Sequence, residues 1–357
     1  MRLSNMSLRV FAFFIVAVLI AIAALACNGN KGGGTVKLQG AGATFPNPLY
    51  QKWISEFSKA TPSVQIDYQS IGSGGGIKQL QAQTVDFGAS DAPMTEEELK
   101  ASPGPVVHIP TVLGAVVITY NVPGVSSALR FSPEVLADIY LGKITKWNDA
   151  RIHADNPGAN LPANDISTVH RSDSSGTTFV FTDYFSKVSS EWKEKVGANK
   201  MPKWIGGIGA KGNEGVTGQV KNTPNTIGYV ELAYAVQNKL PVALIKNKAG
   251  NFVEPTIDGV TAAAAGAIAT TPEDLRVSIT DADGATVYPI SSYTYVLAYQ
   301  DQKDAAKGKA LVDFLWWGIH DGENFAKDLQ YAPLPAEIVK RAEAKINSFT
   351  SGGKPLR

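Results

Sequence analysis

The sequence predicts an α/β fold. Stretches with the alternating pattern of strands take turns with stretches that carry helix-start signals, which is typical of a sheet covered by helices. Val64–Gln69 alternates apolar and polar residues with a period of two, as a half-buried strand does. Leu49, Trp53 and Phe57 recur at every fourth residue and form one apolar stripe of a helix that begins near Pro46.

Further signals mark other helices and two long strands. Hydroxyl residues followed by glutamate or by a first-turn proline predict helix starts at Thr95–Glu98, Ser132–Glu134 and Thr271–Asp274. Two apolar, β-rich stretches, Pro110–Tyr120 and Tyr288–Tyr299, are each long enough to cross between two lobes.

These two crossing stretches predict the domain organisation. We expect a first lobe made of residues 36–113 plus 292–357, and a second lobe, residues 114–291, inserted into it. The chain shows no repeat of solenoid period, so it is expected to be globular, and its length suits two domains.

The first 26 residues predict a signal peptide. Arg2 and Arg9 supply the positive start, and Val10–Ala26 is an apolar run of 17 residues. This run is slightly shorter than the roughly 18 residues expected of a membrane span. Export fits better than a permanent span.

Cys27 is the only cysteine and follows the apolar run directly, so it has no partner for an internal disulfide. Ala24-Leu25-Ala26-Cys27 resembles a bacterial lipobox, although leucine usually stands three places before the cysteine and here stands two before it. We expect Cys27 to be lipidated, with residues 27–35 as a flexible tether. The alternative is an ordinary signal peptide cut nearby.

Charge argues against a nucleic-acid partner. Without Arg2 and Arg9, the 33 basic residues become 31, against 32 acidic ones. Such a balance gives no support for a nucleic-acid partner, which would favour a basic face. Any anion must therefore be captured by local geometry.

Three loops have that geometry. Each follows a strand, consists of small and hydroxyl residues and leads into a helix: Gly40–Pro46, Ile71–Gly76 and Arg171–Thr178. Backbone N–H groups and the dipole at a helix start favour an anion. The loops match neither a P-loop nor a complete dinucleotide motif, so they indicate a bare small oxyanion.

The sequence resembles the substrate-binding component of bacterial phosphate-specific ABC transport systems. The similarity covers nearly the whole mature chain, and the stretches that carry it are Gly40–Pro46, Asp86–Pro93, Ile139–Ile144, Arg171–Thr177, Gly228–Glu231, Asp301–Lys303 and Gly353–Leu356. The resemblance implies a two-lobed periplasmic-binding-protein fold of type II, with two α/β lobes joined by two crossing strands. It also implies an extracytoplasmic protein that binds inorganic phosphate between the lobes and passes it to the permease subunits of an ABC importer. We expect a monomer without a cofactor or metal.

The resemblance also implies a set of phosphate-binding residues. The positions that match the family motifs are Thr44, Phe45, Ser73, Asp91, Arg171, Ser175, Gly176 and Thr177. Gly74 and Ser174 depart from the family pattern, which often has serine and glycine there, but no donor is lost.

The residue types also suit phosphate on chemical grounds. Arg171 offers planar paired donors, and Asp173 is spaced to hold its guanidinium. Without the loops, this pair would be read as a surface ion pair. Asp91 beside an anion makes sense if the ligand carries a proton, as phosphate does and sulfate does not at neutral pH. Otherwise Asp91 would cap the helix after Pro93.

An enzyme is not expected. Ser174 or Ser175 near His170 and Asp173 suggests a triad only by adjacency, and catalytic motifs such as Gly-x-Ser-x-Gly and His-Glu-x-x-His are missing from the sequence. Two alternatives remain. One is a binding protein for sulfate, molybdate or another oxyanion, and the more distant one is a phosphohydrolase on the same scaffold.

Overall fold

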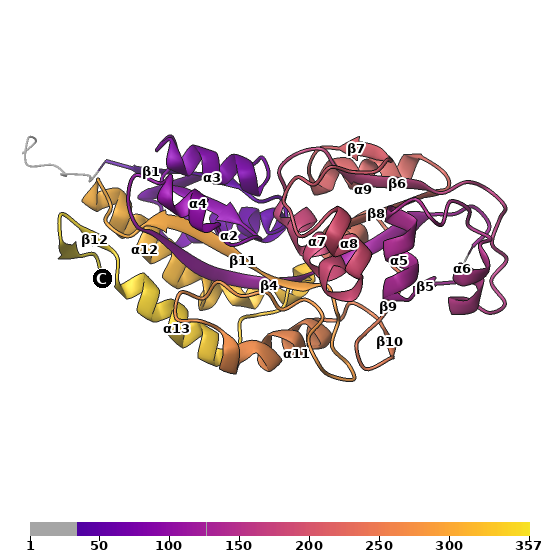
Figure 1. The fold of residues 1–357 in the computed structure, drawn as a ribbon. Coiled ribbons are helices and arrows are strands. Elements are labelled where there is room, and N and C mark those ends of the chain that lie inside the picture. The colour runs from indigo at the N-terminus through magenta and orange to yellow at the C-terminus, as the bar shows by residue number, and fades with distance from the viewer. Residues whose placement is uncertain (1–33, 126) are drawn as a thin grey trace, which may run out of the picture. The chain divides into compact units, whose positions relative to one another are not determined.

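The computed structural model describes residues 34–125 and 127–357, of which Val36–Arg357 forms one compact unit (Figure 1). The predicted signal peptide, Cys27 and most of the predicted tether lie outside the described residues. The strands are β1 (Val36–Gly42), β2 (Val64–Ser70), β3 (Phe87–Ser90), β4 (Val106–Asn121), β5 (Arg130–Phe131), β6 (Ser167–Arg171), β7 (Ile208–Ala210), β8 (Thr226–Glu231), β9 (Leu244–Lys246), β10 (Phe252–Val253), β11 (Ser291–Tyr299), β12 (Thr350–Ser351) and β13 (Lys354–Pro355). The α-helices are α2 (Asn47–Ala60), α3 (Ser73–Gln81), α4 (Glu96–Lys100), α5 (Pro133–Tyr140), α6 (Ala150–Asp155), α7 (Gly176–Val188), α8 (Ser190–Lys195), α9 (Gly212–Asn222), α10 (Leu232–Gln237), α11 (Ile257–Ala267), α12 (Ala305–Gly318) and α13 (Ala336–Asn347). Three 3₁₀ helices are η1 (Ile268–Thr270), η2 (Asp321–Phe325) and η3 (Lys327–Leu329).

The main sheet is mixed and has eight strands in the order β2-β1-β3-β11-β4-β8-β6-β7. β1 runs parallel to β2 and β3, and β6 runs parallel to β7 and β8. The two strands in the middle of the order, β11 and β4, are antiparallel to their neighbours. Parallel strands need crossover connections, and the helices between these strands supply them.

Strand β4 takes part in both halves of this sheet. Its residues Val106–Ala115 pair with β11, and Val116–Asn121 pair with β8. We call β1, β2, β3, β11 and β4 up to Ala115, with the helices between them, the first lobe. The second lobe contains the rest of β4 with β8, β6 and β7, and the helices and loops between them. The Pro110–Tyr120 stretch predicted to cross therefore lies within one continuous strand.

The structure confirms the α/β class and several local predictions. The predicted strand is β2, and the predicted apolar stripe is the buried face of α2. The capping box is present at α4: Thr95 Oγ1 accepts the Glu98 N–H at 3.2 Å, and Glu98 Oε2 accepts the Thr95 N–H at 2.9 Å. α5 begins after Ser132 as expected, although the hydroxyl donates to Asp155 instead of capping the helix.

The helix predicted after Thr271 is wrong. Residues 271–279 form a turn at 273–274 and otherwise have no regular secondary structure. Leu275 has a left-handed φ of 64°, which breaks a helix, and Asp274 accepts both the backbone N–H and the guanidinium of Arg276. A carboxylate that accepts a hydrogen bond from a backbone N–H two residues further on competes with helix formation. At this position the local contact prevents the helix.

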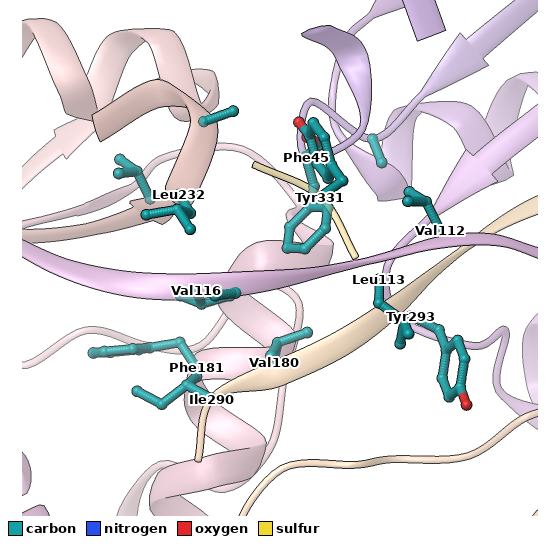
Figure 2. Packing of buried hydrophobic residues seen from close by; sticks show 14 of the residues in the cluster. Phe45, Val112, Leu113, Val116, Val180, Phe181, Leu232, Ile290, Tyr293 and Tyr331 are labelled. Carbon is teal, nitrogen blue, oxygen red and sulfur yellow. The ribbon is translucent and has the colours of Figure 1, made fainter. Parts of the chain in front are cut away.

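Aromatic and aliphatic side chains fill the space around β4 (Figure 2). Phe45 and Tyr331 pack together with ring centroids 6.4 Å apart, and both are fully buried. Ala332 pairs with Leu113 of β4, which fixes Tyr331 beside that strand. Among residues 34–125 and 127–357, no helix is both long and apolar enough to cross a membrane.

Candidate functional site

The three loops predicted from the sequence are strand-to-helix connections, and two of them meet directly. β1 leads into α2, β2 into α3, and β6 into α7. The Gly176 N–H, at the start of α7, donates to Ser73 Oγ at 3.0 Å. The Gly74 N–H donates to the Ser174 carbonyl at 3.0 Å. The start of α3 in the first lobe therefore faces the start of α7 in the second lobe.

The loop Gly40–Pro46 reaches the same place through Thr44. The Thr44 hydroxyl oxygen accepts two hydrogen bonds from Asn213 of α9, one from the backbone N–H at 3.2 Å and one from Nδ2 at 2.7 Å. Asn213 Nδ2 also lies 3.2 Å from Thr177 Oγ1. The neighbouring Phe45 is held by the Tyr331 hydroxyl, which donates to its carbonyl at 2.7 Å. All three loops thus converge between the lobes.

Arg171, at the end of β6, is the buried cation of this cluster. Its side chain is 1% exposed, and Nε donates to Asp173 Oδ1 at 2.7 Å while Nη2 contacts Oδ2. Burial by itself would raise the pKa of the Asp173 carboxyl, but the Arg171 guanidinium holds it below its ordinary value. Asp173 also accepts the Gly212 N–H at 3.0 Å. The guanidinium is therefore fixed in one plane, with Nη1 3.4 Å from Thr177 Oγ1.

Four buried hydroxyls around this point act as acceptors toward the protein. Within the described chain, each accepts at least one N–H donor and none donates to a protein atom; they are those of Thr44, Ser73, Ser175 and Thr177. Ser175 also caps α7 by accepting the Thr178 N–H at 3.0 Å. Because each hydroxyl has one proton to give, the cluster offers several hydrogen-bond donors without matching acceptors.

Asp91 contributes the opposite feature, one free acceptor. It follows β3, is 2% exposed, and its Oδ2 has no hydrogen-bond partner among the described residues. A Cβ at Gly176 would lie 2.5 Å from this oxygen, so the carboxyl closely approaches the start of α7. Burial raises the pKa of Asp91 to about 7, against the Thr294 hydrogen bond and the charge of Arg171. The cap of α4 is Thr95, so Asp91 does not serve as that helix cap.

Comparison with known proteins gives the chain its family. The model of the PBP superfamily domain matches residues 29–316. A protein of Xylella fastidiosa named phosphate-binding protein PstS is 46% identical over 312 residues, which cover 87% of this chain and 85% of the relative. PstS of Pasteurella multocida is 46% identical over 322 residues, covering 89% and 93%. The chain belongs to the PstS family of the PBP superfamily.

Solved structures agree with this family fold. A high-affinity periplasmic phosphate-binding protein, PfluDING, bound with phosphate, has a TM-score of 0.71 and 23% identity to this PstS-family chain, covering 87% of it and 93% of PfluDING. A phosphate ABC transporter substrate-binding protein of Clostridium perfringens with bound phosphate has a TM-score of 0.59 and 19% identity, covering 84% of this chain and all of the other. At this level of identity the likeness shows the fold, the two-lobed α/β architecture predicted from the sequence.

Sequence reasoning missed two residues of the cluster in this PstS-family chain. Asn213 links Thr44 and Thr177 across the lobes, and Thr294 of β11 donates to Asp91 Oδ1 at 2.8 Å. A signal for Asn213 was available, because β7, Gly212 and α9 form a fourth loop of the same strand-glycine-helix plan. Thr294 lies inside a strand without any local motif, and only the fold brings it to Asp91.

The described residues contain no group of three or more histidine, cysteine, aspartate or glutamate side chains placed to hold a metal ion. His170, next to Arg171 in sequence, stacks on Trp204 with centroids 4.7 Å apart, and its Nδ1 lies 3.1 Å from the Arg171 carbonyl oxygen. Asp173 is engaged by Arg171. The adjacent Ser-His-Asp residues are therefore not arranged as a triad.

Proposed function

We propose that this chain binds inorganic phosphate, as HPO₄²⁻ or H₂PO₄⁻, between its lobes and delivers it to an ABC-type importer. The observation that carries the proposal is the match between the cluster and the ligand. Several hydroxyl protons have no protein acceptor assigned in the described chain, the buried guanidinium of Arg171 is held in place beside them by Asp173, and the Oδ2 oxygen of Asp91 lacks a donor. Protonated phosphate has oxygens to accept from the hydroxyls and a proton for this Oδ2.

The proposed binding residues are those predicted from the sequence. They are Thr44, Phe45, Ser73, Asp91, Arg171, Ser175, Gly176 and Thr177, with Asp173 in support. Their convergence from the three loops and from the end of β3, and thus from both lobes, supports the assignment. Two lobes that each supply part of one site can close over the ligand, which is the type of motion that such folds use.

The proposed domain boundaries are also those expected from the sequence, residues 36–113 plus 292–357 for the first lobe and 114–291 for the second. The pairing of β4 changes partner after Ala115, and β11 begins at Ser291, which supports both boundaries to within a few residues. The named relatives are binding proteins, which supports binding rather than catalysis. We propose that the protein acts as a monomer.

The site favours phosphate over the alternative oxyanions. Sulfate carries no proton at neutral pH, so its oxygen would meet the free Asp91 Oδ2 as a second acceptor. Two facing acceptors in a buried place repel each other and leave both unsatisfied. Calorimetric titration with phosphate, sulfate and molybdate at pH 8 tests this. We expect phosphate to bind at least about a hundredfold more tightly than sulfate, a gap of about 3 kcal/mol. Equal affinities would contradict the phosphate assignment.

We also propose that Cys27 is a lipid anchor that holds the protein at the outer face of the membrane. Its position after the apolar run and before a glycine-rich segment supports this. Cys27→Ser is expected to move the protein from the membrane fraction to the soluble fraction or to block its processing. A Cys27→Ser protein that still carries a labelled lipid would disprove the assignment. Asn28→Ser, which leaves the thiol in place, serves as the control.

A further inference from the structure

The two carboxylate oxygens of Asp91 have different surroundings. Oδ1 accepts the hydroxyl of Thr294 at 2.8 Å, and both side chains are buried, with 2% and 0% exposed. Oδ2 has no partner in the described part of the chain and approaches the start of α7 at Gly176. One side of the carboxyl is therefore fixed by the protein, and the other side faces the proposed ligand.

The Thr294 hydroxyl is the donor in its hydrogen bond with Asp91. It donates to Asp91 Oδ1 at 2.8 Å, and the bond from Thr111 goes to the Thr294 carbonyl instead, at 3.2 Å. The Tyr50 hydroxyl also interacts with the Thr294 side chain. A hydroxyl has one proton to give, and beside an ionised carboxylate, which can only accept, it donates that proton to the carboxylate while its own lone pairs stay free to accept from another hydroxyl. This donation stabilises the ionised carboxyl over the protonated one.

We propose that Thr294 is the positioning residue that sets the anion specificity of this site, because its donation to Asp91 Oδ1 keeps the carboxyl an acceptor and leaves Oδ2 to receive the proton of the ligand. The inference rests on the proposed phosphate binding and names a residue that governs selectivity through Asp91. If Asp91 became protonated, it would turn into a donor, and a donor fits unprotonated sulfate.

Near neutral pH the ionised and the protonated forms of Asp91 are similar in free energy, and the hydrogen bond from Thr294 favours the ionised form. Burial raises the pKa of Asp91 to about 7, and the Thr294 hydrogen bond is the largest of the effects that oppose burial, followed by the charge of Arg171. The titratable groups that face Asp91 from the packed elements are Arg171 of β6, Glu231 of β8, Tyr50 of α2, Tyr68 of β2 and Tyr331 before α13. Burial raises the pKa of Glu231 well above its ordinary value, and it also raises the pKa of each of these tyrosines. Arg171 and Thr294 are thus the groups that favour an ionised Asp91.

The test is the sulfate and phosphate affinity of the purified full chain, measured by calorimetry from pH 5 to pH 9. For the wild type, sulfate affinity is expected to fall about tenfold per pH unit above about pH 7, as the protonated Asp91 disappears. In Thr294→Val the fall-off is expected to move up by about one pH unit or more, since a hydrogen bond to a charged group is lost. At pH 8 to 9 the phosphate-to-sulfate ratio of this variant should therefore be about tenfold lower.

Two control variants separate specificity from packing. Thr294→Ser keeps the hydroxyl and is expected to retain the pH profile of the wild type. Thr111→Val removes the neighbouring buried hydroxyl, which donates to the Thr294 carbonyl, and is expected to leave the phosphate-to-sulfate ratio unchanged. Thr294→Ala is a second variant without the hydroxyl, in case Thr294→Val does not fold, and thermal melts establish folding for each.

The outcomes are distinct. A folded Thr294→Val or Thr294→Ala protein with the wild-type pH profile overturns the role of Thr294 while the phosphate function stands. Loss of selectivity in Thr294→Ser as well also overturns it, because the hydroxyl would then not be the cause. A wild type that binds neither anion, or both equally at pH 8, overturns the proposed function itself. The expected shift in the variants without the hydroxyl, with rescue by Thr294→Ser, supports the inference.

Discussion

Lys200 of the second lobe forms an ion pair with Glu98 of the first lobe, and its backbone carbonyl accepts the Ser175 N–H at 2.9 Å. One residue thus connects the cap of α7 to the far side of the cleft. The two side chains are 13% and 26% exposed, so the pair is partly shielded from solvent. A contact of this kind is made when the lobes are together and is lost when they separate.

Glu98→Gln should therefore weaken phosphate binding without unfolding the protein. Glutamine keeps the capping box of α4 but removes the charge that Lys200 meets. A partly exposed pair contributes about 0.5–1 kcal/mol, so affinity should fall about two- to fivefold, and the difference should shrink in high salt. Calorimetric titration at two salt concentrations measures this. Lys52→Gln, which breaks a pair with Glu56 inside α2, should have no effect. Equal losses in both variants would mean that the effect is a general one of charge.

Arg171→Met should remove most of the phosphate affinity. The loss of a charged partner from a desolvated anion costs about 2–5 kcal/mol, which corresponds to at least about a thirtyfold weaker complex. Because the substitution also leaves Asp173 unpaired, Arg171→Met/Asp173→Asn should be measured beside it. Arg151→Met, at an exposed arginine paired with Asp138, is the control and should bind as the wild type does. Tight binding by a folded Arg171→Met protein would refute the site.

Asp91→Asn should stabilise the ligand-free protein at alkaline pH. Burial raises the pKa of Asp91 from 3.8 to about 7, so the folded state holds its proton more tightly than the unfolded state. The stability of the wild type consequently falls as pH rises from about 4 to about 7, and the full loss is present above pH 7. The gain in Asp91→Asn should be near zero at pH 4 and on the order of 2–4 kcal/mol at pH 8. Denaturant unfolding at both pH values measures it, with the exposed Asp165→Asn as control. A gain of the same size at both pH values would exclude titration as its source.

His108→Gln should reduce the acid sensitivity of the fold. Burial lowers the pKa of His108 from 6.5 to about 3, and its Nε2 accepts the Met94 N–H at 3.0 Å. The folded state resists a proton that the unfolded state takes up, so wild-type stability is lost as pH falls from about 6.5 to about 3. By pH 4 the free energy of unfolding of the wild type should have fallen by about 2–4 kcal/mol more than that of the variant, in which glutamine supplies a neutral acceptor. His153→Gln, at an exposed position, should behave as the wild type; a parallel decline of all three proteins would contradict this account.

The sequence predicts those structural features that depend on residues close together along the chain. The stripe of Leu49, Trp53 and Phe57 and the capping box at Thr95 follow from spacings of three and four residues, and the structure has both. The same kind of signal failed at Thr271, because the left-handed Leu275 and the Asp274–Arg276 contacts are equally local and oppose the helix.

The candidate site was predictable where family motifs or loop plans mark it. Several of the contacts that arrange it, however, join residues more than 100 positions apart, such as Ser73 with Gly176 and Asp91 with Thr294. Thr294 was missed for this reason. A threonine within an apolar strand has no local signature, and its role follows only from the pairing of β11 with β3 and β4.

Both lobes contain part of β4, and this shared strand affects how the protein unfolds. One end of this strand pairs with β11 and the other end with β8. Unfolding of either lobe would therefore break hydrogen bonds of a strand that is also part of the other lobe. The two lobes are therefore expected to be coupled in unfolding. A calorimetric scan of the ligand-free protein should contain a single transition whose van't Hoff enthalpy equals the calorimetric enthalpy.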